Sequence, residues 1–164
     1  VVEAGSSQTG NGNTSADPEI LVAIRGLSTN IGAADVTEVE WITTAADKSA
    51  GFTLSVRVRY NEAVTVTGSP TLAVTNGNQG SGGGRGPHTL VYASGSGTNE
   101  LVFSLAIAAN NNATNANDVL TIGAQNIAKP GGATMKDTSD GTTNSAVAIS
   151  ADQGTAAGSI TVVA

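Results

Sequence analysis

The chain has 164 residues, of which 39% are hydrophobic and 3% aromatic, with 7 basic against 13 acidic side chains and a formal net charge of −6. This length fits one domain with its own core, while the acidic balance argues against a phosphate-backbone partner and the few aromatic residues argue against a large ligand pocket. There is no cysteine, so disulfides and thiol chemistry are excluded.

The first 33 residues are predicted to form an arm that does not fold alone. Residues 1–17 are small, polar and rich in Gly, Asn and Ser, and such a composition cannot bury enough apolar surface. An apolar strand is predicted at 19–25, either the first strand of the domain's own sheet or an arm strand bound to a neighbouring subunit, with a short helix as a third interpretation. One face of that strand would carry the predicted assembly contacts Ile20, Val22 and Ile24.

The chain starts Val1-Val2-Glu3, without the basic and apolar regions of a secretory signal. Two histories fit this start, a trimmed initiator Met or a cleaved longer leader, and the first is the simpler expectation. No stretch approaches the roughly 18 apolar residues of a membrane span, so no membrane partner is predicted.

Residues 34–164 are predicted to be an all-β domain. DVTEVEWITT places Val39 and Trp41 on one face with Glu38 and Glu40 on the other, because side chains alternate along a strand. The same alternation runs from Phe52 to Tyr60 and continues through two short apolar runs around a Gly-Ser-Pro turn. Inward-facing positions are predicted at Phe52, Leu54, Val56, Val58 and Tyr60. The two apolar runs contain Val64 with Val66 and Leu72 with Val74.

A Gly-rich loop at 76–88 separates this region from a hairpin, TLVYASGSGTNELVFSLAI. The hairpin turn contains Gly95 and Gly97, which allow positive φ, and the second arm points Leu101, Phe103, Leu105 and Ile107 inward. Weaker strands are predicted near 119–124, 145–150 and 159–164, and one helical turn is an option just before Asp118. Several short strands divided by turn signals indicate a β-sandwich, with a jelly roll or small barrel as weaker fits.

The stretches YNEAVTVTGSPTLAV and YASGSGTNELVFSLAI resemble an immunoglobulin-like module. That module occurs as tandem repeats in large bacterial surface proteins and as single domains in tailed-phage structural proteins. The resemblance spans about Phe52 to Ile107 and continues loosely through 120–141. It implies an immunoglobulin-like β-sandwich and does not reach the arm. Its motifs specify turns and core, so it bears on fold more than on function.

Three features invite a chemical interpretation, and a structural one is favoured for each. His88 is the single histidine, and without cysteine or a second histidine it cannot complete the usual zinc sets, so it is expected to be an exposed loop residue. Asp137 and Asp140 are interpreted as a turn of the Asx type, with calcium as the alternative because it takes oxygen ligands from such loops. Glu38 and Glu40 are interpreted as a solvated strand face and not a glycosidase pair.

The remaining candidates also favour a non-enzymatic protein. The loop GSGGGRGPH lacks the strand-to-helix context and the Lys-Ser/Thr of a phosphate-binding loop. The basic residues considered as a nucleic-acid patch are scattered along the sequence: Lys48, Arg57, Arg59 and Arg85. No catalytic residue, metal ligand or cofactor is therefore predicted.

The sequence favours a structural virion protein of a tailed bacteriophage, a capsid decoration or cement subunit on the outer surface. Its arm would bind neighbouring subunits, either the major capsid protein or copies of itself, in a multi-copy assembly. The alternatives are an extracellular bacterial adhesin or surface-layer module at the cell surface, and a filament-forming subunit that uses strand exchange.

Overall fold

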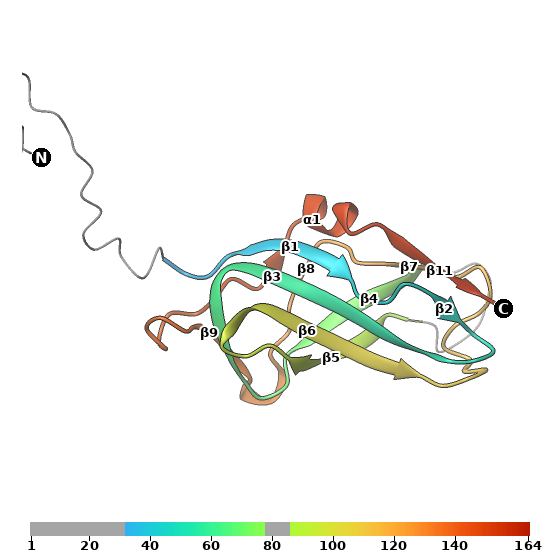
Figure 1. Cartoon of the computed structure of the whole chain (residues 1–164), viewed down its shortest axis with the longest axis horizontal. Coiled ribbons are helices and arrows are strands. Elements are labelled where there is room, and N and C mark those ends of the chain that lie inside the picture. The colour runs from blue at the N-terminus through green and yellow to red at the C-terminus, as the bar shows by residue number, and fades with distance from the viewer. Residues whose placement is uncertain (1–31, 78–85) are drawn as a thin grey trace, which may run out of the picture.

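The computed structural model describes residues 32–77 and 86–164 and is almost entirely β-sheet (Figure 1). The predicted strand at 19–25, with Ile20, Val22 and Ile24, lies outside the described residues, as do 78–85 of the Gly-rich loop. The prediction of an all-β domain is confirmed. The strands are β1 (Val36–Trp41), β2 (Ala46–Asp47), β3 (Phe52–Thr67), β4 (Thr71–Gly77), β5 (His88–Ser94), β6 (Thr98–Ile107), β7 (Val119–Thr121), β8 (Gln125–Asn126), β9 (Thr134–Asp137), β10 (Ala148–Ile149) and β11 (Ser159–Val163). The helices are the 3-10 turn η1 (Pro130–Gly132) and α1 (Ala151–Ala156).

Nine of these strands form one continuous sheet that curls around the core. Its main order is β1-β3-β6-β5-β4-β7-β11-β2, with β9 paired to β3 outside this path. The pairings along the main path are antiparallel until the last, where β2 runs parallel to β11. β1 therefore lies at one edge of the sheet, although β2 follows it closely in sequence. In Figure 1 the chain enters β1 at one end of the body and the C-terminus lies at the other.

Alternation along the strands builds the core as the sequence predicts. β3 buries Leu54, Val56, Val58 and Tyr60 completely or almost completely. On β6 the Phe103 ring is fully buried and meets the Tyr92 ring edge-on, with the centroids 6.1 Å apart. The predicted inward positions Phe52 and Leu105 are half-buried at the margin of this core, and so is Val66.

The predicted turns are also found. Gly68, Ser69 and Pro70 join β3 to β4, and residues 95–97 join β5 to β6. Gly95 has a φ of +108°, and a Cβ built on it would lie 1.9 Å from the carbonyl oxygen of Glu100. No residue with a side chain fits there without moving backbone, which explains the glycine.

The helical turn considered as an option before Asp118 is not found, and a helix occurs where none was predicted. The Ala- and Asn-rich segment before Asp118 forms turns and no helix, with Asn110 and Asn117 at positive φ. The helix lies instead at Ala151–Ala156, where Ser150 and Gln153 form a capping box. A six-residue helix that contains Gly154 is too short to show an amphipathic period, so hydrophobic periodicity could not reveal it. The Ser-x-x-Gln spacing of Ser150 and Gln153 was the signal that could have indicated where this helix begins.

Candidate functional site

The chain is fixed to the body where it enters β1. Ala34 is fully buried, and its carbonyl accepts a hydrogen bond of 2.8 Å from the N–H of Ala146. The N–H of Asp35 donates to Oδ1 of Asn61 (2.7 Å), and the N–H of Asn61 donates back to the carbonyl of Asp35 (3.0 Å). Any polypeptide before residue 34 is thus joined directly to the core and to β3, which lies next to β1 in the sheet.

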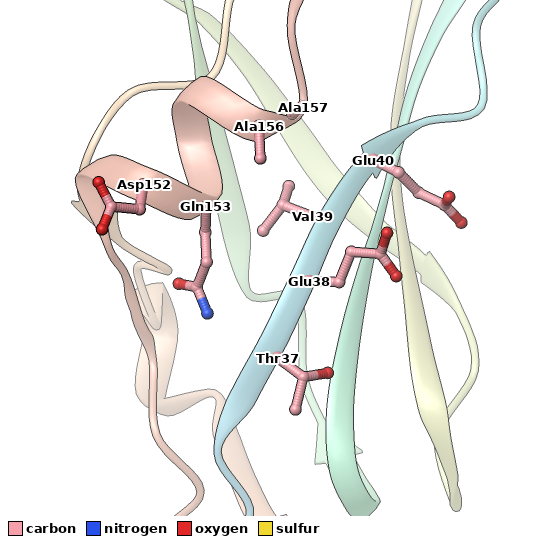
Figure 2. A pocket seen from close by; sticks show the side chains of 8 residues that line it. All are labelled: Thr37, Glu38, Val39, Glu40, Asp152, Gln153, Ala156 and Ala157. Atoms are coloured by element: carbon pink, nitrogen blue, oxygen red, sulfur yellow. The ribbon is translucent and has the colours of Figure 1, made fainter.

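A groove lies along the outer edge of β1, between this strand and α1 (Figure 2). Its volume is about 340 Å³, near the lower end of the range of roughly 300–1,000 Å³ seen for ligand pockets. We call it the β1–α1 groove, and its lining residues are Thr37, Glu38, Val39, Glu40, Asp152, Gln153, Ala156 and Ala157. Figure 2 shows Val39, Gln153 and Ala156 directed into the space between the strand and the helix, with the carboxylates directed away from it.

Polar contacts hold α1 at this edge. Nε2 of Gln153 donates to the carbonyl of Val36 at 2.6 Å, while its Oε1 accepts from the N–H of Ser150 at 2.8 Å. Farther along, Nε1 of Trp41 donates to the carbonyl of Gly158 at 3.4 Å. On the inner side of the helix, a Cβ on Gly154 would lie 2.4 Å from the carbonyl of Ile122, so α1 sits tightly against the body.

The face of β1 with Glu38 and Glu40 carries a network of ion pairs. Glu40 lies 2.8 Å from Arg57 and 3.1 Å from Arg59. Glu38 lies 3.4 Å from Arg59, and Glu100 lies 3.5 Å from Arg57 and 3.3 Å from Arg59. All five side chains are partly exposed, between 31% and 53%. The prediction of a solvated strand face is confirmed, and the two arginines occupy the space between the carboxylates.

The expectation that His88 is an exposed loop residue was wrong. His88 opens β5 opposite Val74 and is only 5% exposed. It shares a face with Leu90, because residues two apart on a strand point to the same side. Burial lowers the pKa of His88, and the nearby Asp118 carboxylate opposes that shift.

A buried polar group adjoins this histidine. Asp118 is fully buried, and its Oδ2 accepts from Nδ2 of Asn76 (2.9 Å) and from the N–H of Asn115 (2.8 Å). Two further polar atoms, Nε2 of His88 and Oγ1 of Thr114, are buried without a hydrogen-bond partner among the described residues. The bond from Asn76 ties the 108–118 segment to β4, and sequence reasoning missed it because Asn76 and Asp118 are 42 positions apart in the chain.

Asp137 and Asp140 form the predicted turn. Oδ1 of Asp137 accepts from the N–H of Ser139 at 2.7 Å, which is an Asx turn. Asp140 accepts from the N–H groups of Thr142 (2.8 Å) and Thr143 (2.9 Å) and from the Thr143 hydroxyl. The Thr143 hydroxyl bond, followed by the two backbone bonds, lowers the pKa of Asp140 well below its usual range. The carboxylate of Asp140 thus serves to close its own turn.

The basic residues do not gather into one patch in the part of the chain that the structure describes. Arg57 and Arg59 are engaged by glutamates, and Nζ of Lys48 donates to Oδ1 of Asn115 at 2.8 Å. Arg85 lies outside the described residues. Over residues 32–77 and 86–164, no group of three or more His, Cys, Asp and Glu is placed to hold a metal ion.

The chain matches no protein-family model, and no match to it is found among curated proteins or solved structures. In the described ranges no helix has the length and apolar character needed to cross a bilayer.

Proposed function

We propose that this protein is a non-enzymatic structural subunit of a tailed-phage virion, a decoration or cement protein on the outer capsid surface. Its body would be an immunoglobulin-like β-sandwich, and its arm of residues 1–33 would anchor it to neighbouring subunits. The assignment to this class rests on the sequence resemblance between Phe52 and Ile107. The anchoring role is supported by the hydrogen bonds that fix Ala34 and Asp35 to the body where the chain enters β1.

An anchor must transmit load from the attached segment to the body. Here the arm continues into β1, which pairs with β3 from Val36 to Trp41. β3 in turn pairs with β6 from Phe52 to Arg59, so the β1–β3 ladder bears a pull on the arm and β6 holds β3 in place. The bonds of Ala34 and Asp35 add three more, each worth about 0.5–1.5 kcal/mol net.

A decoration role also suits the polar surface of the sheet. The outer face of β1, β3 and β6 carries five charged side chains joined by ion pairs. Exposed pairs of this kind contribute little to stability, with a median of about 0–1 kcal/mol, but they keep a sheet face soluble and discourage unwanted edge pairing. Repetition of many weak arm contacts over a capsid would give firm attachment through avidity.

Labelling with an antibody against the body tests the location. We expect label over the heads of intact phage particles, in a regular array, and none on the surface of uninfected host cells. Label on bacterial cell envelopes in the absence of phage would favour the adhesin or surface-layer alternative and overturn the virion assignment.

A further inference from the structure

We propose that His88 and Asp118 form an acid-sensitive latch, which holds the 108–118 segment over the end of β4 at neutral pH and releases it when the imidazole takes up a proton. This segment connects β6 to β7 and lies at the end of the body that also holds the C-terminus (Figure 1). There the N–H of Asn117 donates to the carbonyl of Val162 at 2.8 Å. Neither latch residue takes part in the virion role proposed above.

Strand register brings the latch residues to one inward face of the sheet. His88 pairs with Val74, so Asn76, two positions along β4, points to the same side as the buried Val74. Asn76 in turn pairs with the buried Leu120 of β7. Asp118 comes two positions before Leu120 and is itself fully buried. An imidazole, an amide and a carboxylate therefore lie together beneath the segment.

The 108–118 segment is attached to the body by polar contacts. All of its residues lie in the described part of the chain, and none of its hydrophobic side chains is buried. Oδ2 of Asp118 accepts from Nδ2 of Asn76 (2.9 Å) and from the N–H of Asn115 (2.8 Å). Nδ2 of Asn76 also donates to the carbonyl of Ala113 at 3.1 Å. Regions with few buried apolar contacts open at low cost in free energy, so loss of the Asp118 bonds should free this segment before the rest of the body.

His88 is the group whose protonation disturbs these bonds. Its Nε2 is buried without a hydrogen-bond partner among the described residues. Protonation makes both ring nitrogens donors, and a buried charge without a hydrogen-bonded partner costs far more than a buried neutral group. The Asp118 carboxylate can compensate by turning from Asn76 and Asn115 toward the ring, or the segment can open and admit water. Either response releases the segment.

Burial outweighs the opposing charge at this site. It lowers the pKa of His88, and Asp118 is the charged group that opposes the shift. Nζ of Lys48 donates to Oδ1 of Asn115 at 2.8 Å and does not contribute to the shift. The closed site thus binds a proton less tightly than the open one, and acid favours opening. The neighbouring strands place uncharged side chains on this inward face: Val74, Asn76, Leu90 and Leu120.

Amide hydrogen exchange measured by NMR on the full chain tests the latch. Protection factors, which correct for the intrinsic pH dependence of exchange, are measured for the N–H groups of Asn115 and Asn117. We expect them to fall by up to about tenfold per pH unit as the pH decreases below about 6.5. His88→Gln keeps a polar side chain that does not titrate and should abolish the fall. The internal control is the 137–143 turn, which carboxylates also close and whose protection should stay constant.

Constant protection of Asn115 and Asn117 down to about pH 5 overturns the proposal. An equal fall in His88→Gln, in the control turn or in the core strands does the same, because the response would then not belong to this site. If His88→Gln does not fold, the parent chain still decides, since its single histidine gives an imidazole signal that needs no assignment. We expect that signal to titrate below the usual value of about 6.5, and the protection of the segment to stop falling at the same pH. A midpoint at or above about 6.5 overturns the latch.

Discussion

Replacing Gln153 should release α1 from the edge of β1. The side chain makes two hydrogen bonds, from Nε2 to the carbonyl of Val36 and from the N–H of Ser150 to Oε1. A net hydrogen bond contributes about 0.5–1.5 kcal/mol, and Gln153 is half-buried, so water replaces part of the loss. We expect Gln153→Ala to lower the free energy of unfolding by about 1–2 kcal/mol, near the lower part of the two-bond range.

Gln153→Glu separates the two contacts. The carboxylate still accepts from Ser150 but cannot donate to Val36, so we expect about 1 kcal/mol of destabilisation. Urea unfolding followed by circular dichroism measures both variants, with the exposed Thr155→Ala as a control expected to stay within about 0.5 kcal/mol of the parent. Amide hydrogen exchange should quicken in α1 before the rest of the body. Equal stability of Gln153→Ala and Thr155→Ala would refute the view that this side chain fixes the helix.

Three further predictions concern the body. Gly95→Ala should lower the free energy of unfolding by more than about 3 kcal/mol, because strain at positive φ adds to the overlap of its Cβ with the carbonyl oxygen of Glu100, 1.9 Å away. Gly97→Ala, at φ +83° with open space around its Cβ position, should lower it by only about 1–2 kcal/mol. Equal losses for the two variants in urea unfolding would refute this explanation. Burial lowers the pKa of His88, so the unfolded chain binds a proton at this side chain more readily than the folded chain. The contribution of His88 to stability should therefore be constant above about pH 6.5 and fall as the pH decreases toward the folded-state pKa. His88→Gln should remove that dependence. Arg59→Met should change stability by under about 1 kcal/mol and only at low salt, since its ion pairs are partly exposed; a larger loss in high salt would contradict this.

Strand alternation predicted most of the core because one physical rule governs it. The run from Phe52 to Tyr60 has one buried face and one polar face, and any other register would expose that buried face. β3 nevertheless continues to Thr67 as one strand. Its pairing with β1 ends at Tyr60, and from Val64 onward β9 pairs on that side while Val64 still pairs with Thr98 of β6. Local pattern carries no information about that exchange of partners.

The parts that sequence did not predict depend on contacts between distant residues. β2 has two residues and exists because β11, more than a hundred positions later, runs beside it. His88 looked like part of a glycine-rich loop, yet pairing with Val74 buries it. The β1–α1 groove likewise joins residues near 38 with residues near 154, and only the folded chain brings them together.

The central claim, that the arm anchors this body to its neighbours, is tested most directly by binding of full-length variants to particles that lack the protein. Ile20→Asp, Val22→Asp and Ile24→Asp together place charges on the predicted contact face, and Leu21→Asp with Ala23→Asp provides the control on the opposite face. We predict that co-sedimentation with the particles is lost for the first set and kept for the control. Undiminished co-sedimentation of the triple variant, with the body folded as judged by circular dichroism, would contradict the anchoring role.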